Sequence, residues 1–150
     1  MDRELIREKT MQLIFQMDIN NEFDFSKLTP VEENLKIMNK AQAVSTLEAV
    51  RDHIAEIDEM IRSNLDKWSF DRVAKADLAI LRTAVAEMMF VDSIPRKVSI
   101  NEAVKLSRKY GDSKSYAFVN SVLSKVEKTL SAGSSDKVPD AASNTEAEEK

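Results

Sequence analysis

Residues 74–91, AKADLAILRTAVAEMMFV, restrict the fold of this 150-residue chain more than any other segment. After the first lysine, only Asp77, Arg82, Thr83 and Glu87 interrupt the apolar character of the segment. A helix that is apolar on nearly all sides is usually the buried centre of a helical bundle. The segment therefore predicts an all-α domain that is organised around a central helix at 74–91.

Helical periodicity covers most of the remaining chain, and no segment has the alternation expected of a strand. Residues 44–65 place apolar side chains at spacings of three and four, which predicts a long amphipathic helix. Thr29, Pro30 and Glu32 supply an N-cap, a first-position proline and a capping-box acid for a short helix. The other expected helices are one at 2–19 and two within 98–126.

The C-terminal segment 131–150 has a different composition from the rest of the chain. It is rich in small, polar and acidic residues and carries a net charge of −3. Such a segment cannot bury enough apolar surface to fold. We therefore expect one helical domain at 1–130 followed by a disordered acidic tail at 131–150.

Local signals divide residues 98–126 into two helices with a short connection between them. Ser99 and Glu102 have the spacing of a capping box, and Gly111 stands where a left-handed residue would close the first helix. The second helix is expected to begin near residue 113 or 115. The connection forms a basic and aromatic corner that consists of Arg108, Lys109, Tyr110, Lys114, Tyr116 and Phe118.

The charge of this region favours an anionic partner. Residues 95–128 contain eight lysines and arginines and three acids, a net charge of +5 in a chain whose total is −4. A basic region on an otherwise nearly neutral body suits an anionic ligand, although solvated lysines on helix surfaces are also common.

The first helix carries two apolar ribbons. At about 100° per residue, its main face contains Ile6, Thr10, Leu13, Ile14 and Met17. A second ribbon carries Met11, Phe15 and Ile19. Either both ribbons are buried or the second one contacts a partner.

Composition excludes several classes of site. The chain has no cysteine, and His53 is its only histidine, so thiolate sites, disulfides and histidine clusters are excluded. Two glycines cannot build a phosphate-binding loop. We expect no catalytic site, no metal and no cofactor.

No part of the sequence predicts membrane insertion or export. No apolar run reaches the roughly 20 residues of a membrane span. The first residues, MDRELIREKT, lack the apolar core of a signal peptide. We therefore expect a cytoplasmic protein.

Four motifs in this order resemble the NusB family. They are R-x-x-T-x-Q-L-I-F at 7–15, a tryptophan at 68 with D-x-A-I-L-R-x-A-x-x-E at 77–87, IPRKVSINEAVKLSRKYG at 94–111, and FVNSVL at 118–123. Each motif alone is a weak signal, but their combination is specific. The resemblance extends over residues 3–130 and leaves out the tail.

The resemblance implies a fold of about seven helices in two packed sub-bundles. It implies RNA binding and not catalysis: the family binds the boxA element of nascent ribosomal RNA together with NusE, a protein that also serves in the small ribosomal subunit. This complex helps RNA polymerase to read through terminators. Some relatives form a homodimer.

The same resemblance implies particular contact residues. Arg7, Gln12 and Phe15 on the first helix and Phe118 by the corner correspond to RNA-contacting positions, and Glu87 corresponds to a position that meets NusE. Nearby charges join the expected RNA surface, namely Arg3, Lys9 and, from its place in the corner, Lys114. Phe15 stands where the family often has tyrosine, and Ser121 where it usually has glycine.

Other interpretations of these residues remain open. The fold could be the related RNA-binding domain of RNA cytosine methyltransferases, or a helical protein-interaction module without RNA affinity. Asp77 could brace the start of the central helix, and Glu87 could be a solvated break in it. Phe118 could belong to the core, and Trp68 is expected to be a packing anchor.

Overall fold

The computed structural model describes residues 2–27 and 36–133, which contain five α-helices, two 3₁₀-helices and no strand. The helices are α1 (Arg3–Ile19), α3 (Ala41–Arg62), α4 (Lys75–Phe90), α5 (Arg96–Tyr110) and α6 (Ser115–Gly133), with single turns η1 (Phe25–Lys27) and η2 (Phe70–Arg72). The all-α prediction is confirmed. Within the described residues, the five α-helices and the two 3₁₀-helices together give the expected count of about seven. Most of the short helix predicted from Thr29 falls outside the described residues.

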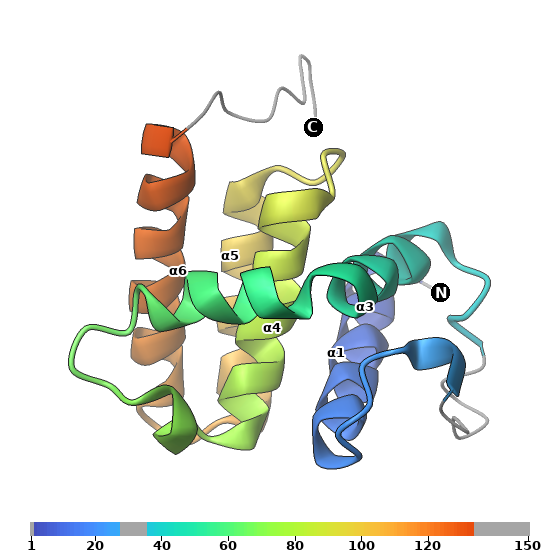
Figure 1. Cartoon of the computed structure of the whole chain (residues 1–150), viewed down its shortest axis with the longest axis horizontal. Helices are drawn as coiled ribbons and strands as arrows, with labels where there is room; N and C mark the ends of the chain where they lie inside the picture. The colour runs from blue at the N-terminus through green and yellow to red at the C-terminus, as the bar shows by residue number, and fades with distance from the viewer. Residues whose placement is uncertain (1, 28–35, 134–150) are drawn as a thin grey trace.

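The central position of α4 is confirmed. Figure 1 shows α4, α5 and α6 side by side, with α1 and α6 on opposite sides of α4 and α3 crossing the group. Helix α4 packs against all four other helices, so α4–α6 form one sub-bundle, and α1 and α3 complete a second one against α4. From Asp77 to Met88, every residue of α4 is buried. Burial on all sides explains why this segment is apolar almost throughout.

Arg82 joins the two sub-bundles at the middle of α4. Its guanidinium donates to both carboxylate oxygens of Asp58 on α3 at 2.8 and 2.9 Å, and lies 3.4 Å from an oxygen of Asp18 on α1. The Arg82 guanidinium also lies 4.9 Å from the ring centroid of Phe23. A buried guanidinium needs such partners because an unpaired buried charge is strongly unfavourable.

Two local predictions for α5 are wrong. Helix α5 begins at Arg96 after Pro95, so Ser99 lies inside the helix and not at its N-cap. Ser99 is buried, and its hydroxyl donates to Glu87 Oε1 at 2.8 Å. Gly111 has φ −94°, which is not left-handed. Glycine is required there by space, because a Cβ at residue 111 would lie 2.3 Å from the Ser115 side chain.

Two further expectations change in detail. Trp68 is 61% exposed and therefore does not serve as a packing anchor. Helix α6 continues to Gly133, slightly beyond the domain boundary expected at residue 130. The tail from residue 134 onward lies outside the described residues.

Candidate nucleic-acid interface

Helix α1 begins with a capped first turn and buries one face. The Asp2 carboxylate accepts a hydrogen bond from the Leu5 backbone N–H at 2.8 Å, which satisfies a donor that has no partner within the helix. All five residues of the predicted main face are buried. The residues of the second ribbon differ in exposure: Met11 is 3% exposed, whereas Phe15 is 37% and Ile19 60% exposed. The second ribbon thus leaves an aromatic and an aliphatic side chain at the surface.

A polar cluster connects α1 to the C-terminal end of α5. Gln12 Nε2 donates to the Tyr110 hydroxyl at 2.7 Å, and this hydroxyl donates in turn to the Glu8 carboxylate. Lys109 Nζ also donates to Glu8, at 2.7 Å. Phe15 lies one turn beyond Gln12 on α1, so its exposed ring belongs to the helix that this cluster joins to the end of α5.

The cluster shifts the pKa values of its acidic groups in opposite directions. Burial alone would raise the pKa of Glu8, but hydrogen bonds from Lys109 and Tyr110 outweigh it and lower that pKa. Burial and the hydrogen bond to the negatively charged Glu8 raise the pKa of Tyr110. Glu8 therefore stays ionised and Tyr110 protonated, which keeps the hydrogen bond between them. Sequence reasoning did not identify Glu8, since its partners are about a hundred positions away.

Reciprocal hydrogen bonds hold the start of α6. Asp112 accepts from the Lys114 backbone N–H at 2.8 Å, while the Asp112 backbone N–H donates to Ser115 Oγ at 3.0 Å. Ser115 Oγ lies within 3.2 Å of Asp77 Oδ2 and donates toward it, which ties the first turn of α6 to the first turn of α4. Lys114 is exposed at this fixed corner.

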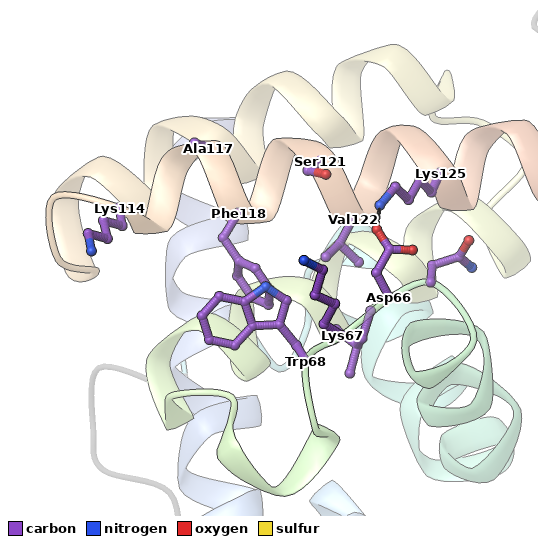
Figure 2. A pocket seen from close by; sticks show the side chains of 11 residues that line it. Asp66, Lys67, Trp68, Lys114, Ala117, Phe118, Ser121, Val122 and Lys125 are labelled. Atoms are coloured by element: carbon purple, nitrogen blue, oxygen red, sulfur yellow. Dashed lines mark hydrogen bonds and ion pairs between the residues drawn. The ribbon is translucent and has the colours of Figure 1, made fainter.

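Aromatic side chains follow the corner along α6. The Arg108 guanidinium lies 4.6 Å from the ring centroid of Tyr116, which is 44% exposed. Phe118 is half-buried, and its ring meets that of Trp68 edge to face, with centroids 5.5 Å apart. Figure 2 shows Phe118 pointing from α6 toward Trp68, with Lys114 one turn before it. The corner thus presents basic and aromatic groups together, which are the groups that bind phosphates and unstacked bases.

Arg7 and Glu87 lie in the interior instead of on this surface. Arg7 Nε and Nη2 donate to Glu87 Oε2 and Oε1 at 2.8 and 3.2 Å, and the two side chains are 7% and 2% exposed. From α5, the Ser99 hydroxyl also donates to Glu87, and Glu102 Oε1 lies 3.9 Å from Arg7 Nη1. Direct contact of Arg7 with RNA and of Glu87 with a protein does not fit these positions, because both charged groups are already bound to each other.

The remaining predicted residues lie in the N-terminal half of α1. Arg3 is exposed, and Lys9 is half-buried. Together with Gln12 and Phe15 they extend along a helix that the Glu8 cluster fixes relative to the corner. Of the expected RNA surface, the structure therefore leaves all members except Arg7 at least partly accessible.

Asp77 lies in the first turn of α4, where its hydrogen bond from Ser115 Oγ at 3.2 Å fits the interpretation of Asp77 as a brace. It is 7% exposed, and its Oδ1 atom has no hydrogen-bond partner. Burial raises the pKa of Asp77, and the negative charge of Asp112 also raises it. The hydrogen bond from Ser115 lowers this pKa but does not outweigh the effect of burial.

The raised pKa of Asp77 predicts a pH-dependent stability difference from an Asp77→Asn variant. Folding favours the protonated form of the Asp77 carboxyl. The stability that this protonation contributes is therefore fully present below the unfolded-state pKa of about 3.9, and it is lost as the pH rises through the folded-state pKa. The stability of the protein relative to the variant should therefore fall with rising pH. Urea denaturation of both proteins from acidic to neutral pH measures this, with Asp71→Asn as an exposed control. A constant difference would contradict the prediction.

Other kinds of site are not found in the part of the chain that the structure describes. Within residues 2–27 and 36–133, no group of three or more histidine, cysteine, aspartate or glutamate side chains could hold a metal ion. None of the described helices is long and apolar enough to cross a membrane.

The fold and these surfaces define an all-helical protein with a candidate single-stranded RNA interface. The sequence pattern of the NusB family matches residues 4–128. The transcription antitermination protein NusB of Oceanobacillus iheyensis is 44% identical over 128 residues, which cover 84% of this chain and 98% of the relative. The chain belongs to the NusB family.

Solved structures agree with this assignment. NusB from Aquifex aeolicus, determined in solution, is 31% identical with a TM-score of 0.72 and covers 95% of this chain and 98% of its own. A chain in the crystal structure of a plectonemic RNA supercoil is 32% identical with a TM-score of 0.75 and covers 88% and 98%, respectively. The two-sub-bundle fold is thus that of the family.

Proposed function

We propose that this chain is a transcription antitermination factor that binds the boxA element of nascent ribosomal RNA together with NusE and helps RNA polymerase to read through terminators. Membership of the NusB family and its transcription antitermination relatives support the proposal. This role belongs in the cytoplasm and requires no cofactor and no catalytic residue.

One observation carries the RNA part of the proposal. The Gln12–Tyr110 hydrogen bond of 2.7 Å joins the α1 surface that exposes Phe15 to the corner that carries the exposed Lys114 and the half-buried Phe118. Single-stranded RNA is bound by such combinations, in which aromatic rings stack on bases and cations neutralise phosphates. We assign the RNA surface to this corner with Arg3, Lys9, Gln12 and Phe15. The buried Arg7 acts indirectly, by fixing α1 against α4.

The NusE part of the proposal rests on family membership. Glu87 is 1% exposed and held by Arg7 and Ser99, so it supports a NusE contact only by positioning α1 and α5 around α4. The surface that meets NusE is then formed by exposed residues of these helices.

Fluorescence anisotropy of a labelled boxA RNA tests the function directly. The RNA is titrated with this chain alone and then with NusE present, at two salt concentrations, and a scrambled RNA serves as control. We expect tighter binding with NusE and preference for boxA. We also expect weaker binding at higher salt, because the basic side chains of the protein release counterions from the RNA phosphates when they bind. Absence of binding by a folded protein under both conditions would instead favour a protein-interaction module.

Phe15→Ala is expected to weaken boxA binding by about 1 kcal/mol or more while the helical content remains unchanged. The ring of Phe15 is exposed enough to stack on a base, and its removal leaves the buried face of α1 intact. Leu5→Ala is a matched control on the same helix, because Leu5 is 38% exposed and Phe15 37%. Equal affinities of the two variants would remove Phe15 from the RNA surface.

A further inference from the structure

A groove runs between the outer face of α6 and the segment that follows α3. Its volume is about 780 Å³. One wall is formed by residues 64–68 and the other by α6, as Figure 2 shows. The groove begins beside Lys114 and Phe118, so it continues the corner described above.

Trp68 presents a large aromatic surface to this groove. It is 61% exposed although its ring contacts Phe118, whereas tryptophan is on average a highly buried residue. Packing therefore does not explain its position. An exposed indole beside a second ring offers a face on which a base can stack, at little cost in conformational entropy if the segment is held in place.

The segment that carries Trp68 is held in place. Asp66 adopts a left-handed conformation with φ 58°, and the Trp68 backbone N–H donates to Leu65 O at 3.0 Å, which closes a tight turn. The Asp66 carboxylate also forms an ion pair with Lys125 on α6. The turn thus fixes the indole relative to the helix that forms the opposite wall.

The charge of the groove favours a polyanion as occupant. Three lysines line it, Lys67, Lys114 and Lys125, against the single acid Asp66, which is paired with Lys125. Lys67 and Lys114 are both exposed at its rim. An apolar peptide would not need these cations, whereas a single-stranded nucleic acid uses both the cations and the ring.

We propose that single-stranded RNA continues from the α5–α6 corner into this groove, where one base stacks on Trp68 and Lys67 neutralises a phosphate. This inference rests on the proposed RNA-binding function and adds to it a binding element contributed by the segment between α3 and η2.

The tryptophan itself reports on the groove, because Trp68 is the only tryptophan in the chain. Titration of the full chain, with NusE present, with unlabelled boxA RNA should quench its emission at the same RNA concentrations at which anisotropy detects binding. Trp68→Leu should weaken binding by about fivefold or more, since stacking contributes at least that much per base. Trp68→Phe should retain most of the affinity. Melting temperatures confirm that both variants fold.

Charge is tested separately with two lysine variants. Lys67→Ala should reduce the slope of log affinity against log salt by about 0.7, the contribution of one phosphate contact. Lys40→Ala is the matched control, because Lys40 is exposed and precedes α3 at the opposite end of that helix from Lys67.

The outcomes separate the two proposals. If boxA RNA binds without quenching and Trp68→Leu binds with unchanged affinity, the groove is not part of the RNA site, although the proposed function stands. If NusE alone quenches Trp68, the groove is a protein contact and the inference is overturned. If no RNA binds under any condition, the proposed function itself fails.

Discussion

Glu87→Ala is expected to lower the free energy of unfolding by about 3–5 kcal/mol. The substitution leaves the Arg7 guanidinium buried at 7% exposure without the carboxylate to which it donates two hydrogen bonds. Removal of one partner from a buried pair is strongly unfavourable because the remaining charge stays desolvated. Urea denaturation followed by circular dichroism measures the loss. Glu48→Ala, at an exposed position on α3, should change stability by less than about 0.5 kcal/mol.

A double-variant cycle separates loss of the pair from loss of packing. Arg7→Met combined with Glu87→Met removes both charges and fills the space with apolar atoms, so the double variant should be more stable than either single variant. Additive losses would show that the two side chains act independently, contrary to the 2.8 Å contact between them. The cycle also matters for function, because weaker RNA or NusE binding by an Arg7 or Glu87 variant has to be compared with its folded fraction.

The helical architecture could be predicted from sequence because the signals for it are local. The apolar character of residues 74–91 follows from burial of α4 on all sides, and the five buried positions on the main face of α1 follow from helical spacing. Both patterns depend only on which neighbours share a helix face. They do not depend on which distant helix covers that face.

The site was predictable only in part, because several of its contacts are long-range. Arg7 and Glu87 are 80 positions apart, so no spacing rule identifies them as partners. Ser99 has the local pattern of an N-cap, but Pro95 allows α5 to begin earlier, and the serine hydroxyl then serves Glu87. The exposure of Trp68 depends on the turn at Asp66, which no periodicity indicates.

Gly111→Ala is expected to destabilise the protein by about 1–3 kcal/mol. The added Cβ would lie 2.3 Å from both Cβ and Oγ of Ser115 and 2.8 Å from the carbonyl oxygen of Ser107. Neither neighbour is the free end of a flexible side chain: Ser107 O belongs to the last turn of α5, and Ser115 is buried in the first turn of α6. The two helices must therefore move apart. Ser113→Ala, at an exposed position in the same corner, should have little effect.

Ser115→Gly tests whether this clash is the cause. It removes both atoms that lie 2.3 Å from the new Cβ, so the double variant should lose less stability than the sum of the two single variants. Additive losses would place the strain at Ser107 O alone. Because the corner also sets the position of Lys114 and Phe118 relative to Tyr110, Gly111→Ala should weaken boxA binding even where the protein remains folded. Full affinity in a destabilised variant would show that RNA binding tolerates movement of α6 against α5. The α1 surface would then bind RNA without a fixed position of the corner.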